Sequence, residues 1–119
     1  PSTGGRHFVN LASLPFQIPL RALVAPGYAN FLVAGKALGT THLTNGCYRL
    51  HPIEWNIGES AAHTARYCRA HALPPEAIAG DPKHCETLQE QLTSAGIELQ
   101  WPDEATRSVL AEHKAHLHT

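Results

Sequence analysis

Residues 30–62, NFLVAGKALGTTHLTNGCYRLHPIEWNIGESAA, form the most informative stretch of this chain. The continuous apolar run at residues 31–34 predicts a strand that is covered on both faces. This run stops at Gly35, where the missing side chain lets a ligand or another backbone come close. A loop rich in Thr, Asn and Gly follows, and Pro52 then opens a helix. We therefore expect a buried strand, a polar loop and a helix in close succession.

The helix is expected over residues 52–72. Proline at the first helical position costs no hydrogen bond, and Glu54 lies where the helix dipole favours an anion. Apolar and small side chains recur at spacings of three and four and predict one inward face, made of Ile53, Ile57, Ala61, Thr64 and Cys68. Two consecutive prolines, Pro74 and Pro75, end the helix.

Shorter elements are expected on both sides of this helix. Upstream, residues 7–11 and 20–25 have the composition of short strands. Downstream, we expect one helical turn over residues 75–79. Asp81 then caps a helix that carries the stripe Cys85, Leu88, Leu92 and Ala95 and ends at Gly96.

The last part of the chain has weaker patterns. Residues 97–101 alternate apolar and polar side chains, which predicts a short strand or extended segment. Asp103 can cap a short helix to about Glu112. Residues 113–119 are polar and are expected to be disordered.

Composition excludes several classes of protein. The chain has 119 residues, of which 43% are hydrophobic and 16% charged, and its net charge is −1. It has no apolar run near the roughly 20 residues that a membrane span needs. The balanced charge gives no reason to expect a nucleic acid or a membrane surface as partner. Three cysteines without a C-x-x-C pair favour reduced thiols in the cytoplasm.

Five short motifs occur in order within residues 16–72. They are IPLRALV at 18–24, LVAGK at 32–36, TH at 41–42, RLHP at 49–52 and GESA at 58–61. Together they resemble the last flavin-contacting segment of FAD-dependent oxidoreductases with the dinucleotide-binding fold. No G-x-G-x-x-G fingerprint is present, although such enzymes hold the ADP half of FAD on that turn. The resemblance therefore implies a carboxyl-terminal piece of a larger enzyme, inactive without the ADP-binding half.

The resemblance also implies a fold and a site. The fold expected is an α+β fragment, in which a few strands complete a flavin-binding sheet. Residues 1–74 would belong to the FAD-binding domain and residues 75–119 would form a helical tail. FAD would contact Gly35, Lys36, Arg49, Leu50, His51, Pro52, Asn56, Ile57 and Gly58. The helix start would face the pyrimidine edge of the flavin, where negative charge accumulates on reduction.

Several of these residues also have ordinary structural explanations. His42 and His51 could act as acids or bases, or could be hydrogen-bonded structural histidines. Asn56 could bond the flavin or a backbone group, and Trp55 is a core or interface residue rather than a stacking platform. The histidines and cysteines lack the paired spacing of a structural zinc site, so no metal is expected. Cys68 and Cys85 fall on inward helical faces and are expected to be small core residues.

The expected partner is the rest of the flavoenzyme or a second copy of the chain. A non-catalytic interaction module on a flavoprotein-derived scaffold is the alternative. A truncated sheet exposes an edge and an apolar face, which would bind such a partner.

Overall fold

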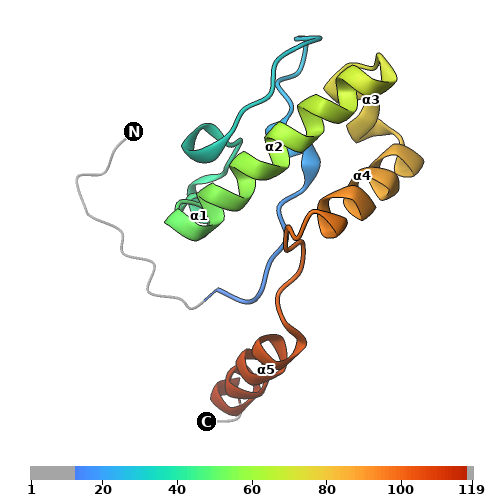
Figure 1. Ribbon diagram of the computed structural model, residues 1–119. Helices are drawn as coiled ribbons and strands as arrows, with labels where there is room; N and C mark the ends of the chain where they lie inside the picture. Colours follow the sequence, from blue (N-terminus) through green and yellow to red (C-terminus); the bar gives the residue numbers. More distant parts are fainter. Residues whose placement is uncertain (1–12, 118–119) are drawn as a thin grey trace, which may run out of the picture.

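The computed structural model describes residues 13–117, and the side chains of this range up to Ala111. Within this range the chain forms two short 3-10 helices and five α-helices (Figure 1). The elements are η1 (Leu20–Leu23), η2 (Gly35–Ala37), α1 (His42–Tyr48), α2 (His51–His71), α3 (Pro75–Gly80), α4 (Pro82–Ser94) and α5 (Asp103–Leu117).

The expected α+β fold is wrong for residues 13–117, which contain no strand. The segment predicted as a strand at residues 20–25 is largely the 3-10 helix η1, which ends in a single antiparallel bridge between Val24 and Leu32. The predicted strand at residues 31–34 is not covered on both faces, because Phe31 is exposed. Apolar β-prone residues form strands only where neighbouring strands pair with them. The described residues contain no further strand to extend the bridge into a sheet. The strand predicted at residues 7–11 lies outside the described residues.

The long helix is confirmed. The sequence predicts residues 52–72, and α2 spans His51–His71 with a proline in its first turn. Its buried side chains include Ile57, Ala61 and Thr64 from the predicted inward face. The helix ends where Ala72 adopts a left-handed conformation, with φ of 54°.

The loop expected between Gly35 and Cys47 instead contains helix α1. Thr41 caps this helix: its hydroxyl accepts a hydrogen bond from the amide of Thr44 at 3.2 Å, and the hydroxyl of Thr44 accepts one from the amide of Thr41 at 2.9 Å. This reciprocal pair satisfies two amides that would otherwise lack partners. The sequence pattern missed α1 because the usual capping box has Glu or Gln where this chain has Thr44.

The downstream helices largely match the prediction. The expected helical turn is α3, and the carboxylate of Asp81 accepts a hydrogen bond from the amide of Lys83 at 2.9 Å to cap α4. Leu88 and Leu92 are buried as predicted, and Gly96 follows α4 with φ of 82°. Ala95, in contrast, is exposed. Residues 97–101 are extended but join no strand.

The last helix is longer than predicted. We expected a helix to about Glu112 and a disordered tail over residues 113–119. In the structure α5 continues to Leu117, and it extends away from the other helices (Figure 1). Residues 113–117 are therefore helical, and the rest of the predicted tail lies outside the described residues.

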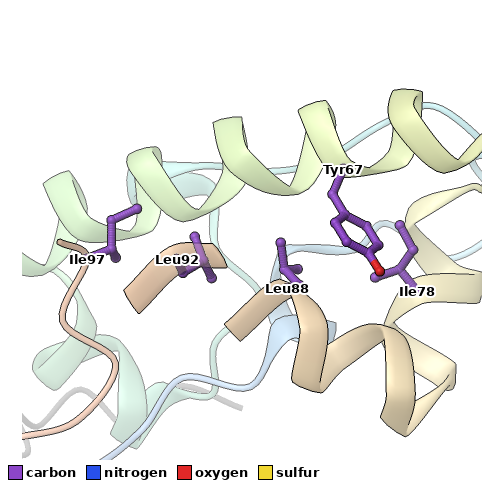
Figure 2. Packing of buried hydrophobic residues seen from close by; sticks show 5 residues of the cluster. All are labelled: Tyr67, Ile78, Leu88, Leu92 and Ile97. Atoms are coloured by element: carbon purple, nitrogen blue, oxygen red, sulfur yellow. The ribbon is translucent and has the colours of Figure 1, made fainter. Parts of the chain in front are cut away.

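Two clusters of buried side chains hold the helices together, and α2 contributes to both. The first, which we call the tyrosine cluster, consists of Tyr67, Ile78, Leu88, Leu92 and Ile97 (Figure 2). In Figure 2 the ring of Tyr67 points from α2 toward the side chains of Ile78 and Leu88. The second, the glycine-turn cluster, consists of Leu23, Leu38, Ile57 and Ala61 and packs the segment around η1 and η2 against α2.

We expect Ile78→Ala to lower the free energy of unfolding by about 2–5 kcal/mol, because Ile78 is 0% exposed and truncation leaves a cavity. The matched control is Leu43→Ala on α1, where the side chain is 68% exposed. This control should change stability by no more than about 0.5 kcal/mol. Urea denaturation followed by circular dichroism measures both, and equal losses would contradict the packing described.

Candidate functional site

The structure brings together two of the segments predicted to contact FAD. The turn η2, which contains Gly35 and Lys36, packs against α2. The ammonium nitrogen of Lys36 lies 4.0 Å from the Oε1 atom of Glu54 in the first turns of α2. We call the group Gly35, Lys36, His51, Pro52 and Glu54 the helix-start site.

Glu54 is the most enclosed charged group of the helix-start site. Its side chain is 14% exposed, and its Oε2 atom lies 3.4 Å from Nδ1 of His51. Its Oε1 atom is buried, and no described residue donates a hydrogen bond to it. A buried acceptor without a partner is unfavourable, so this oxygen is available to a donor from outside the described residues.

The backbone at the start of α2 is also open. Leu50 precedes the helix, and no side chain caps its first turn. Leu50 is exposed, and the side chain of His51 is 90% exposed. Free amides at a helix start carry partial positive charge and suit an electron-rich group. The carboxylate of Glu54 offsets part of that charge.

Two glycines near this site are not required by packing within the described chain. Gly35 has φ of 54°, a conformation that favours glycine, and a Cβ added there would meet no atom within 4 Å. A Cβ added at Gly58, inside α2, would also meet none. Glycine inside a helix costs roughly 1 kcal/mol relative to alanine. The space beside both glycines is therefore open to a ligand or partner.

The remaining predicted contacts have other positions. The side-chain amide of Asn56 donates a hydrogen bond to the carbonyl of Glu98 at 2.9 Å, which supports its structural explanation. Ile57 is buried in the glycine-turn cluster. Arg49 is exposed at the end of α1. Trp55 is 73% exposed and is therefore not a core residue in the described chain.

A groove of about 560 Å³ lies along the same helix and is mostly apolar. We call it the apolar groove. Its walls come from residues 16–23, from one face of α2, from α4 and from the extended residues 98–102. Pro52, Ile53 and Asn56 line it, so it begins beside the helix-start site.

Aromatic side chains hold one end of the apolar groove. The ring centroids of Phe16 and Tyr48 lie 5.1 Å apart, and those of Phe16 and Trp101 lie 6.0 Å apart. The indole nitrogen of Trp101 donates a hydrogen bond to the carbonyl of Phe16 at 3.0 Å. Through Trp101, these contacts join the extended residues 97–102 to the segment before η1. Sequence patterns did not predict this contact.

The family model described as FAD dependent oxidoreductase matches residues 1–92 of the chain. This chain belongs to the FAD-dependent oxidoreductase family. The match covers the helix-start site and all nine residues predicted to contact FAD, and it supports the resemblance drawn from the five motifs. Comparison with curated proteins and with solved structures gave no match.

The helix-start site of this oxidoreductase-family chain fits a flavin in two respects. Open space lies beside Gly35 and Gly58, and the buried Oε1 atom of Glu54 can accept a hydrogen bond from a hydroxyl or N–H group. Glu54 was not among the predicted contacts. Its position in the first turn of the expected helix indicates only a partner of the helix dipole, because Lys36 lies 18 residues earlier in the chain.

Two further findings concern metals and membranes. In the part of the chain that the structure describes, no three His, Cys, Asp or Glu side chains gather as a metal centre would require. Among the described helices, none combines the length and apolar composition of a membrane span.

Burial raises the pKa of the Cys68 thiol, because desolvation disfavours the thiolate. Cys68 also packs against the tyrosine cluster, as expected for a core cysteine.

At pH 8 the folded chain should therefore hold a smaller thiolate fraction at Cys68 than the unfolded chain. In a Cys47→Ser, Cys85→Ser background, iodoacetamide should alkylate Cys68 more slowly in buffer than in urea. A Cys68→Ser, Cys85→Ser variant, which leaves only Cys47, corrects for the effect of urea on the reagent. Equal rates at Cys68 would contradict its burial.

Proposed function

We propose that this chain is the carboxyl-terminal portion of an FAD-dependent oxidoreductase and supplies the turn and helix that face the flavin. It lacks activity by itself, because the ADP-binding half of the site is not found in its sequence. The observation that carries the proposal is the contact between the Gly35 turn and the open start of α2, within the segment that matches the family.

Individual residues have distinct roles in this proposal. Gly35 leaves room for the ribityl or phosphate portion of FAD, and Gly58 leaves room along α2. The backbone amides at His51 and Ile53 face electron-rich atoms, whereas Pro52 has no N–H to offer. When bound, the flavin ring supplies the hydride or electron transfer of the family.

The charges of the helix-start site suggest a change from the sequence-based roles. Lys36 is among the residues predicted to contact FAD, but its ammonium nitrogen lies 4.0 Å from Oε1 of Glu54. We assign Lys36 to holding the turn η2 against α2 and to compensating the buried carboxylate. Glu54 is then the residue that can accept a hydrogen bond from FAD.

The partner and the compartment belong to the same proposal. The remainder of the flavoenzyme is the proposed partner, and the open groove and exposed Trp55 support the idea that another surface packs here. The three free cysteines, Cys47, Cys68 and Cys85, support a cytoplasmic location.

Titration with FAD, followed by flavin absorbance and fluorescence, tests the proposal. The chain alone should bind FAD weakly, and the polypeptide that also carries an ADP-binding half should bind it stoichiometrically. Gly58→Leu should weaken binding in that polypeptide at least tenfold, because the side chain fills the open space along α2. Glu59→Leu is the matched control on the neighbouring exposed position and should leave affinity unchanged.

Two outcomes would contradict the proposal. Tight stoichiometric binding of FAD by the chain alone would show that no second half is required. Equal affinities for Gly58→Leu and Glu59→Leu would show that the flavin does not lie along α2. The encoded sequence before Pro1 gives an independent check, since a glycine-rich βαβ unit is expected there.

A non-catalytic interaction module is the second candidate, and the apolar groove favours it. Large exposed apolar surfaces usually mark interaction sites. Size-exclusion chromatography with light scattering separates the two candidates. The module is favoured if the chain is a monomer, melts cooperatively and does not associate with an ADP-binding half.

A further inference from the structure

Two histidines from different helices lie side by side where α2 meets α4. His71 is the last residue of α2, and His84 lies in the first turn of α4. The centroids of their imidazole rings lie 5.6 Å apart, with an angle of 68° between the ring planes. His71 is exposed and His84 is half-buried, so solvent reaches the pair.

Tyr67 fixes the position of both rings. Its hydroxyl lies 2.9 Å from Nδ1 of His84, and its ring centroid lies 4.1 Å from that of His71. Tyr67 itself is 2% exposed and packed in the tyrosine cluster. A buried phenol therefore contacts two imidazoles that reach the surface.

The hydrogen bond to Tyr67 leaves Nε2 of His84 free. Histidines that bind a metal commonly donate the other ring N–H to an oxygen acceptor, which fixes the tautomer and the ring orientation. The phenol oxygen can accept from Nδ1–H of His84 in this way. The lone pair of Nε2 is then available to a metal ion.

The separation of the rings agrees with chelation of one ion. A zinc–nitrogen bond is about 2.0–2.1 Å long, and the centre of the imidazole ring lies roughly 1.1 Å beyond the nitrogen. With a tetrahedral angle at the metal, the centres of two ligating imidazoles are then about 5.2 Å apart. The observed 5.6 Å differs from this by a few tenths of an ångström. A small rotation of the exposed His71 can close that difference.

The helix ends around the pair have opposing electrostatic effects. The carboxyl end of α2 at His71 favours a cation, whereas the amino end of α4 near His84 disfavours one. The carboxylate of Asp81 offsets the latter, because it caps α4. Binding must therefore come from coordination by the imidazoles rather than from the dipoles.

We propose that His71 and His84 form a two-ligand surface site for a late divalent transition metal such as Zn²⁺ or Ni²⁺, with Tyr67 as its positioning residue. Water completes the coordination. Imidazole nitrogen suits these ions, whereas Mg²⁺ and Ca²⁺ prefer oxygen ligands. A bound ion links α2 to α4 directly and stabilises their packing. This site is separate from the helix-start site and does not depend on the proposed function.

Isothermal titration calorimetry with Zn²⁺, repeated with Ni²⁺, tests the proposal on the full-length chain. His113, His116 and His118 are replaced by alanine in every protein, so that they do not contribute. We expect one ion per chain and a rise in melting temperature on addition of Zn²⁺. Mg²⁺ should give neither effect.

Four variants locate the site. His71→Ala and His84→Ala should each lower Zn²⁺ affinity at least tenfold and abolish the rise in melting temperature. Tyr67→Phe keeps the buried ring but removes the hydroxyl, and it should weaken binding by about tenfold. His42→Ala, on the exposed start of α1, is the matched control and should bind like the parent.

An equal loss of Zn²⁺ affinity in His42→Ala and His84→Ala would overturn the proposal, since binding would then be adventitious. Unchanged affinity in both His71→Ala and His84→Ala would overturn it as well. A decrease in His84→Ala with no change in Tyr67→Phe would remove the positioning role assigned to Tyr67. Circular dichroism of each variant without metal shows whether the helices are retained.

Discussion

The packing of one face of α2 positions both buried clusters of this protein. Ile57 and Ala61 from this face hold the segment around η1 and η2, while Tyr67 holds α3 and α4. Thr64 lies between these two groups with no exposed surface, and its hydroxyl donates a hydrogen bond to the carbonyl of Ser60 at 2.7 Å. That bond satisfies the buried hydroxyl inside an apolar surrounding. One helix therefore contributes to both cores. The segment at η1 links them as well, because Leu20 packs against the tyrosine cluster and Arg21 donates a hydrogen bond to the carbonyl of Ala79 at 3.4 Å.

The same packing determines the chemistry at each end of α2. At its start, the glycine-turn cluster fixes η2 beside the helix and so encloses Glu54 next to Lys36. At its end, the tyrosine cluster buries the ring of Tyr67 and leaves its hydroxyl beside His84. Both arrangements pair a polar group with a rigid apolar support. The polar groups at the two ends of the helix are thus positioned by burial of the residues between them.

The sequence predicted the helices better than the strands for a physical reason. A helix satisfies its own backbone hydrogen bonds, and local signals such as Pro52, Asp81 and Gly96 mark its ends. A strand requires partners that a local pattern does not specify. Residues 31–34 are apolar, yet they make only one bridge with the neighbouring segment, so the predicted sheet is not formed in the described residues.

For the candidate site, the sequence identified the turn at Gly35 and the helix start, but it did not identify their charges. Lys36 and Glu54 are 18 residues apart, and only folding reveals that they face each other at 4.0 Å. The sequence allows Asn56 to bond either the flavin or a backbone group, and its hydrogen bond to the carbonyl of Glu98 supports the structural explanation.

Motifs and residues close together in the chain are sufficient to identify the family, the long helix and the caps of α4. Only folding produces the enclosure of Glu54, the apolar groove and the contact between His71 and His84. These features need side chains from elements far apart in sequence, and packing rather than local preference sets their distances.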